Sequence, residues 1–316
     1  MNKIDFATFK GGMIEGSALL VGVSEEIIAK NNNPYIRLTF SDGSMKQEIN
    51  LFKRREDFGF EVGTVLDLKL QHTGKNINIL EYSPSKEQNP TDFVVMAEIP
   101  GEKSFNEIMG TLANMKKTAY PNNDPHTLYD VAMTMLTKYR ERLVKYPASA
   151  KYNHVYEGGL IYYINMMVKD AFLMSMSHKT HGDWEVVISA LAVCEIGKLM
   201  GLDYNGYEMP ETTFFADTRS EVEYAATEAE QIMNGWEIDP LRRENFLVCI
   251  RSSRLKREWG ATVNPITLEA HYVSSINHME AKADIYIGEC KKLQIGEGTK
   301  EPPKDCRIWH NVYRLS

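Results

Sequence analysis

A run of positive charges that ends in an aromatic residue is one of two segments of this sequence whose residue types could bind phosphate. The run reads RSSRLKREW and contains Arg251, Arg254, Lys256, Arg257 and Trp259. Guanidinium and ammonium groups bind phosphate through charge-assisted hydrogen bonds. The run therefore predicts a phosphate-binding surface, and the competing interpretation is a solvated helix end whose charges bind nothing.

Two predicted strands carry a second set of residues suited to nucleic acid. Apolar side chains alternate with polar ones over residues 35–40 and 45–53, which directs Ile36, Leu38 and Phe40 to one face. The opposite face and the residues after it hold aromatic, amide and cationic groups: Tyr35, Arg37, Lys46, Asn50, Phe52, Lys53, Arg54 and Arg55. Because rings stack on bases and cations follow phosphates, this face predicts single-stranded nucleic-acid binding. Alternatively, Phe52 covers the bottom of a barrel or contacts another domain.

Isolated histidines and cysteines are weaker candidates for metal binding or nucleophilic chemistry. His154 stands alone near a predicted helix start, and His271 and His278 lie seven residues apart on one predicted helix. We interpret these as packing or solvated side chains, and Cys194 as a buried structural thiol that lacks a suitably placed base. The cysteines form no CxxC pair: Cys194, Cys249, Cys290 and Cys306. Neither a disulfide framework nor a structural zinc site is expected.

The first third of the chain has the pattern of a small β-domain. Short apolar or alternating runs are separated by Asn, Gly, Pro and Asp clusters. The predicted strands are residues 17–23, 35–40, 45–53, 64–71 and 76–82. Five strands at this spacing indicate an OB-type barrel, and a sandwich fragment is the structural alternative.

The rest of the chain has helical periodicity, which makes the fold class α+β. Three prolines between residues 82 and 100 indicate a linker. The predicted helices are residues 106–115, 128–143, 159–177, 184–200, 219–234, 240–256 and 266–292. We expect an OB-type barrel over residues 1–85, a linker and bridging helix over 86–122, and an all-α domain over 123–316.

Composition limits the function classes without selecting one. The chain has 316 residues, 43% of them hydrophobic, and a formal net charge of −7. An acidic chain gives no global electrostatic case for nucleic acid, although a local basic patch can still bind it. No apolar signal segment or membrane-length stretch is present in the sequence, so we expect a cytoplasmic protein without a membrane partner.

Three segments resemble motifs of the YhaM-like 3′–5′ exoribonucleases. The string NHVYEGGLIYY, residues 153–163, is similar to the family's HHxYxGGLLEH. LAVCEIGK, residues 191–198, resembles LLHDIGK, and INHMEAK, residues 276–282, resembles ADNLDAK. The segments occur in the family's order and spacing. The resemblance implies an N-terminal OB domain and an HD-like helical domain over 123–316.

In the same alignment, this chain has other residues at the positions where an HD site has its metal-binding residues. In such a site, His and Asp side chains hold divalent metals that activate a water for phosphodiester hydrolysis. Here the replaced positions are Tyr163, Cys194, Glu195, the pair Ser252-Ser253, Asn277 and, in a looser alignment, Tyr224. The resemblance therefore implies a degenerate HD domain with no metal and no cofactor, in which the cations of residues 251–257 bind phosphate directly.

From these observations we expect a non-catalytic protein that binds single-stranded nucleic acid, with DNA favoured over RNA. The expected role is an accessory factor in replication or transcription, and a viral origin, in the host cytoplasm, would fit so altered an enzyme. One alternative is a divergent metal-dependent 3′–5′ exonuclease. Another is a protein-interaction scaffold that contacts a polymerase. Apolar helix positions such as Met166, Met167, Phe172 and Met174 suggest a homo-oligomer.

Overall fold

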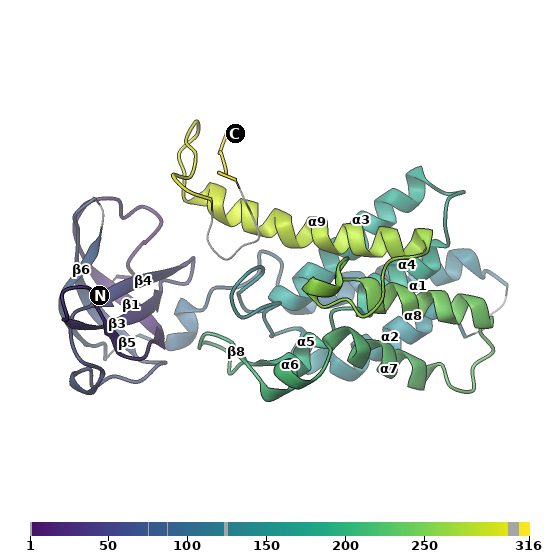
Figure 1. Cartoon of the computed structure of the whole chain (residues 1–316), viewed down its shortest axis with the longest axis horizontal. Helices are drawn as coiled ribbons and strands as arrows, with labels where there is room; N and C mark the ends of the chain where they lie inside the picture. Colours follow the sequence, from purple (N-terminus) through teal and green to yellow (C-terminus); the bar gives the residue numbers. More distant parts are fainter. Residues whose placement is uncertain (1, 75, 87, 123–125, 303–309) are drawn as a thin grey trace. The chain divides into compact units, whose positions relative to one another are not determined.

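The computed structural model describes residues 2–74, 76–86, 88–122, 126–302 and 310–316. Two compact units form from the chain. The first contains Met1–Met96 together with Tyr204–Pro210, and the second contains Ala97–Asp203 together with Glu211–Ser316. The first unit is an antiparallel sheet and the second is helical (Figure 1). The fold class is therefore α+β, as the sequence predicts.

The first unit is built on one long strand with partners on both sides. Its strands are β1 (Gly12–Val23), β2 (Ile27–Ile28), β3 (Pro34–Ser41), β4 (Lys46–Leu51), β5 (Val65–His72) and β6 (Ile77–Pro84). Short 3-10 turns are η1 (Arg55–Asp57) and η2 (Pro90–Phe93). β1 pairs with β3 and β5, β3 pairs with β2 and β4, and β5 pairs with β6, all antiparallel.

The sheet is open, which corrects the prediction of a closed barrel. β4 lies beside β6, but no backbone ladder joins them in the described residues. Alternation of apolar residues determines which face of a strand is buried, whereas closure depends on the tilt and stagger of the strands, which a local pattern does not contain. The predicted sidedness is confirmed, because Ile36, Leu38 and Phe40 are fully buried.

β1 buries both of its faces. Ala18 and Leu20 belong to the main core of the sheet, which includes Phe40. Leu19 and Val21 point to the other side and form a smaller cluster that also contains the following residues: Val65, Phe93, Tyr207 and Met209. A strand buried on both faces reads as a continuous apolar run, and SALLV has that character.

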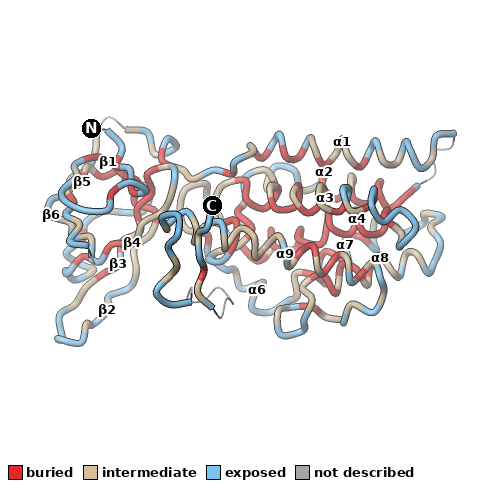
Figure 2. Tube along the Cα trace, turned by 90° about the horizontal axis from the view of Figure 1, so that it is seen from above, coloured by how far each residue is buried: buried red, intermediate tan, exposed pale blue. Residues whose placement is uncertain are grey.

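The second unit is a helical bundle. Its longer helices are α1 (Gly101–Ala119), α2 (Leu128–Leu143), α3 (Gly159–Ser177), α4 (Trp184–Val193), α7 (Glu221–Ile232), α8 (Pro240–Ser252) and α9 (Leu268–Lys291). Shorter elements are α5 (Lys198–Gly201), β7 (Leu202–Asp203), β8 (Glu211–Thr212), α6 (Phe214–Thr218) and η3 (Arg257–Trp259). Every residue of α4 is buried, so α4 is the centre of the bundle (Figure 2). The bounds predicted for α2 and α3 are confirmed.

Two predicted helices end earlier than their apolar pattern suggests. The segment 184–200 is divided into α4 and α5, because a Cβ on Gly197 would lie 2.0 Å from the Glu221 carbonyl oxygen and the chain turns there. α8 ends at Ser252, and Leu255 adopts a φ of 66°. Lys198, directly after the first interruption, and Arg254, in the turn at the second, line the same cavity, which is described below.

The remaining sequence expectations concern thiols and membranes. Cys194, Cys249 and Cys290 are free thiols, the first two buried, and Cys306 lies outside the described residues. No helix in the described part of the chain is long and apolar enough to cross a membrane.

Candidate functional site

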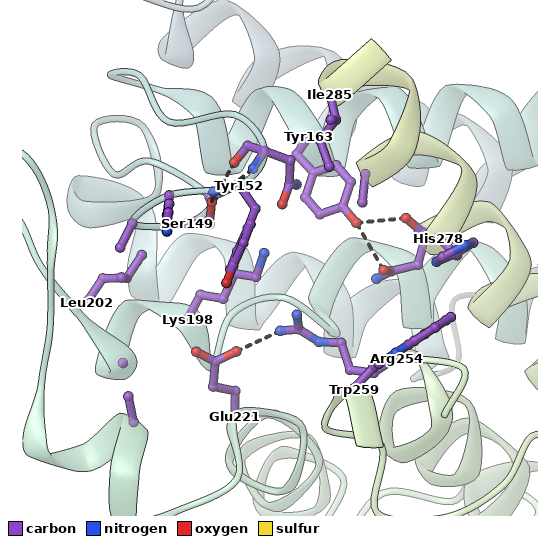
Figure 3. A pocket seen from close by; sticks show the side chains of 18 of the residues that line it. Ser149, Tyr152, Tyr163, Lys198, Leu202, Glu221, Arg254, Trp259, His278 and Ile285 are labelled. Atoms are coloured by element: carbon purple, nitrogen blue, oxygen red, sulfur yellow. Dashed lines mark hydrogen bonds and ion pairs between the residues drawn. The ribbon is translucent and has the colours of Figure 1, made fainter. Parts of the chain in front are cut away.

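The second unit encloses a cavity of about 530 Å³. Its walls come from the segment before α3, from α3 and α5, from the turn after α8, and from α9 (Figure 3). Four cations and one carboxylate line it: Lys151, Lys198, Lys282, Arg254 and Glu221. Tyr152 and Trp259 add aromatic surface. The lining is thus cationic in a chain whose net charge is −7.

A hydrogen-bonded chain of buried side chains forms one wall. The Tyr163 hydroxyl donates toward Asn277, 2.8 Å from its backbone carbonyl oxygen and 2.9 Å from Oδ1. Asn277 Nδ2 donates to Glu195 Oε1 at 2.7 Å. Tyr163, Asn277 and Glu195 are all buried, so these hydrogen bonds join α3, the α4–α5 turn and α9 inside the bundle.

Glu195 is the charged centre of this wall. Its Oε2 lies 2.9 Å from Lys198 Nζ and 3.2 Å from Arg254 Nη2. Arg254 Nη2 also lies 2.7 Å from Glu221 Oε2 (Figure 3). Burial raises the pKa of the Glu195 carboxyl, but Arg254 and Lys198 outweigh burial and hold that pKa at about 2. Glu195 is therefore ionised and paired.

The side chains at the replaced HD positions do not fit a metal pair. Tyr163 and Asn277 are neutral and bonded to each other. Burial raises the pKa of the Cys194 thiol to about 12, so a thiolate ligand is disfavoured at neutral pH. The described residues contain no group of three or more His, Cys, Asp or Glu that could hold a metal ion. Glu195 is the one acid in the set, and two cations already neutralise it.

The predicted basic run is divided by the structure. Arg254 and Trp259 line the cavity, and the Trp259 ring stacks on His278 with centroids 5.0 Å apart. Arg251 points elsewhere, with Nε 3.1 Å from Glu223 Oε2. Lys256 and Arg257 are exposed and do not line the cavity. Of the four predicted cations of this run, only Arg254 is among the described residues that line the cavity, and binding of phosphate by the run stays a prediction.

His154 lies in the core beside the cavity wall. Its ring stacks on Tyr163 at 4.8 Å, and its nitrogens lie 3.7 Å from Glu280 Oε1 and 3.8 Å from Asp284 Oδ2. The backbone of His154 has a φ of 50°, and its carbonyl oxygen approaches Gly159 closely. A Cβ on Gly159 would lie 2.2 Å from this oxygen. His154 therefore packs under the start of α3.

Lys198, Tyr152 and Lys282 line the cavity, although the sequence did not single them out as site residues. Lys198 follows Glu195 by three residues, a spacing at which helical side chains form ion pairs. This spacing is the sequence feature from which the position of Lys198 beside Glu195 could have been predicted. Tyr152 lies in a segment without periodicity, so its sequence carried no such signal. Lys282 is one of several lysines on α9 and is distinguished by its position alone.

The first unit has a smaller cavity of about 410 Å³ on the predicted binding face. Arg37, Asn50 and Phe52 line it together with residues of the β5–β6 turn: His72, Asn76, Ile77 and Asn78. Arg37 and Asn50 are direct partners in the β3–β4 ladder. The Tyr35 and Phe52 rings lie 5.7 Å apart, and 63% of Phe52 is exposed.

Other cations predicted for this face lie away from the cavity. Lys46 Nζ lies 3.4 Å from Met209 Sδ, and burial lowers the pKa of Lys46 to about 8. Lys53 Nζ donates to the Tyr82 hydroxyl at 2.9 Å. Arg54 pairs with Glu56, and Arg55 Nη1 donates to the Phe58 carbonyl oxygen. The strand pattern predicts which face of the sheet these side chains leave from, but it does not predict the neighbouring residues that they contact.

Comparison with known proteins shows similarity over nearly the whole chain. The 3′–5′ exoribonucleases YhaM of Bacillus pumilus and Bacillus subtilis are each 24% identical over 294 residues, covering 89% of both chains. The Listeria welshimeri protein of the same name is 22% identical over 288 residues, covering 88% of both chains. No family model and no solved structure matches. The chain has a YhaM-like sequence, which confirms the resemblance inferred from its motifs.

These relatives overturn the functional expectation. A non-catalytic, viral, DNA-preferring accessory protein is contradicted by relatives that are all named 3′–5′ exoribonucleases. The comparison favours the alternative of a divergent exonuclease. Replacement of individual metal-ligand residues does not by itself establish that the exoribonuclease reaction is lost. The similarity to these relatives covers 89% of the chain.

Proposed function

We propose that this chain acts on single-stranded RNA as a divergent 3′–5′ exoribonuclease. The observation that carries the proposal is the continuous similarity to proteins of that name, over 88–89% of both chains. Similarity of this extent includes the sheet unit and the helical unit together, so it supports a shared arrangement of binding and reaction regions rather than one shared motif.

The helical unit is the proposed site for the RNA 3′ end. The three matched motifs lie on α3, at the α4–α5 turn and on α9, which supports an HD-like unit. Each contributes a side chain to the cavity: Tyr163, Lys198 and Asn277. Four lining cations suit the phosphates of a strand, and Tyr152 and Trp259 offer surfaces for a base. A volume of about 530 Å³ lies within the range of small-ligand pockets.

The sheet unit is the proposed strand-binding region. Pairing of β1 with both β3 and β5, the β3–β4 and β5–β6 ladders, and the position of β4 beside β6 support a partly open, OB-type fold. OB folds bind oligonucleotides on the surface that corresponds here to β3 and β4. Phe52 would stack on a base, Arg37 would meet a phosphate, and Asn50 would hydrogen-bond to the strand.

A degradation assay tests the proposed activity. The full chain is incubated with a 5′-labelled linear RNA and with the same RNA in circular form, each in Mg²⁺, in Mn²⁺ and in a chelator. We expect a ladder of products shortened from the 3′ end of the linear RNA and an intact circle. Linear RNA that stays intact under every condition would overturn the proposal, as would cleavage of the circle.

A pair of variants separates this activity from a contaminating nuclease. In the double variant Glu195→Gln with Arg254→Met, one negative and one positive charge are removed together, so the net charge of the cavity is unchanged while Lys198 and Glu221 lose these partners. We expect the ladder to weaken at least about tenfold. Lys103→Glu alters an exposed residue of α1 and serves as the charge-change control, with the ladder unaltered. Equal rates in both variants would contradict the assignment of the reaction to this cavity.

A further inference from the structure

The charged centre of the helical cavity lies where the resemblance places metal ligands, and it consists of ion pairs between cations and acids of this chain. One guanidinium nitrogen, Arg254 Nη2, lies 3.2 Å from Glu195 and 2.7 Å from Glu221 and so bridges the two acids. Lys198 Nζ and Asn277 Nδ2 approach Glu195 at 2.9 and 2.7 Å. A divalent cation would have to displace Arg254 to reach both carboxylates.

Such a displacement is unfavourable for two reasons. Divalent metals require several oxygen or nitrogen ligands in a defined geometry, and the described side chains around Glu195 are mainly a phenol, a thiol, an amide and two cations. Removing one partner from a buried ion pair also leaves an uncompensated charge. Glu195 is completely buried, and only 20% of the Arg254 side chain is exposed, so water would compensate poorly.

The described residues that line the cavity include more cations than carboxylates. The cations Arg254 and Lys198 lie against Glu195 and Glu221. Lys151 and Lys282 also line the cavity, and Glu221 is the one carboxylate among its described lining residues. In a chain of net charge −7, this concentration of cations favours entry of an anion over entry of a metal.

Arg254 retains donors for such an anion. Among the described residues it donates one side-chain hydrogen bond, from Nη2 to Glu221, so Nη1 and Nε are available. A guanidinium held by two carboxylates is fixed in orientation, and a planar pair of donors matches two oxygens of a phosphate. Arg254 and Lys198 approach the same oxygen of Glu195, and both line the cavity together with Tyr152 (Figure 3).

We propose that this cavity binds a phosphate group through Arg254, Lys198 and Lys282 and does not hold a divalent metal. The fixed cations neutralise the charge that a metal pair would neutralise in an HD site. Assignment of the phosphate to an RNA end rests on the proposed function. Binding of a phosphate as such does not, because free phosphate and a nucleoside monophosphate have the same recognised group.

Calorimetric titration of the full chain tests the anion. The chelator-treated protein is titrated at constant ionic strength with inorganic phosphate, with a nucleoside 5′-monophosphate, and with chloride. We expect saturable binding of both phosphates and none of chloride. Weaker binding of inorganic phosphate than of the nucleotide would identify a nucleotide end as the source, and equal binding would identify free phosphate. Absence of saturable phosphate binding would overturn the proposal.

Titration with Mn²⁺, followed by the electron paramagnetic resonance of the free ion, tests the metal. We expect the free-ion signal of the chain to match that of the double variant Glu195→Gln with Arg254→Met. Stoichiometric Mn²⁺ uptake that is lost in this variant would overturn the proposal, because the two acids would then be metal ligands.

A single variant at the edge of the cavity keeps the test independent of the buried ion pairs. Lys282→Glu should weaken phosphate binding about tenfold, because a charge reversal beside the anion replaces attraction with repulsion. Lys103→Glu makes the same change on α1 and should leave binding within about twofold. Equal loss in both variants would show an effect of net charge alone and would contradict a site. Phosphate binding without RNA degradation would reject the proposed function and retain this inference, and degradation without phosphate binding would do the reverse.

Discussion

Each unit has a cavity beside an arginine–carboxylate pair, and the two pairs differ in exposure. On the sheet, Arg37 and Glu48 lie 3.6 Å apart with 44% and 62% of their side chains exposed. In the bundle, Glu195 is completely buried and Arg254 is 20% exposed. Exposed pairs contribute little to stability and can rearrange, whereas a buried pair is fixed because separation leaves a charge without solvent. The sheet face therefore suits adaptable strand contacts, and the bundle suits one fixed geometry.

Loss of one member of the buried pair should give the largest effect. Arg254→Ala leaves Glu195 with Lys198 as its remaining cation and should lower the free energy of unfolding by about 3 kcal/mol. Arg37→Ala should change it by less than about 0.5 kcal/mol. Urea denaturation of the two variants measures both values. Similar losses in the two variants would remove the distinction between the pairs.

Next in size is the stacking contribution of the sheet face. Phe52→Ala should weaken binding of single-stranded RNA about tenfold, since one base–aromatic stack contributes roughly 1–3 kcal/mol. Met13→Ala removes another exposed apolar side chain, 63% exposed on β1, and should leave affinity unchanged. Fluorescence anisotropy with labelled RNA gives both affinities. Unchanged affinity in Phe52→Ala would exclude this residue from the binding surface.

One buried lysine, Lys198, and one partly buried lysine, Lys46, extend the comparison to pH. Lys198 pairs with Glu195, whereas burial lowers the pKa of Lys46 from 10.5 to about 8. Between pH 8 and 10.5, Lys46 is protonated in the unfolded chain but deprotonated in the native chain. The free energy of unfolding should therefore rise with pH from about 8 to 10.5. Lys46→Met should abolish this contribution and raise stability at pH 7 by on the order of 1 kcal/mol. Thermal denaturation across that range measures it, and an identical pH dependence in the variant would refute the assignment.

The smallest expected effect is the salt dependence of the sheet face. Each phosphate contact on a single strand contributes about 0.7 to the slope of log affinity against log salt concentration. Arg37→Gln should reduce the slope by about that amount if Arg37 meets one phosphate. The corresponding change at Arg54, which pairs with Glu56 away from the cavity, is the matched control and should leave the slope as it is. Equal slopes for Arg37→Gln and the unaltered chain would place Arg37 off the strand.

Local features of the fold were predictable from the sequence. The bounds of α2 follow from its apolar periodicity and from a capping box between Thr127 and Asp130. The burial of Ile36, Leu38 and Phe40 follows from strand alternation. The division of residues 184–200 was not predictable, because it depends on the approach of the distant Glu221 backbone to Gly197.

The candidate site was only partly predictable for the same reason. Arg254 was identified as a cation near the replaced metal position, but its two carboxylate partners come from α7 and the α4–α5 turn. Lys46 was placed on the correct strand, whereas Lys53 lies just after the end of β4, and Met209 and Tyr82 are the neighbours of their ammonium groups. The resemblance to exoribonucleases was recognised from motifs, while the inference of lost activity went beyond what substituted ligands establish.

The first unit is assembled from two stretches that are far apart in the gene. Tyr207 and Met209 pack on the cluster that contains Leu19, Val21 and Phe93. A fragment that ends at residue 96 would contain every strand of the sheet but would lack Tyr207 and Met209. The apolar patch that this exposes would favour aggregation. Low stability of such a truncated fragment would therefore reflect the loss of Tyr207 and Met209 and not an intrinsic instability of the sheet. The functions of the two units are better separated by point substitutions in the intact chain.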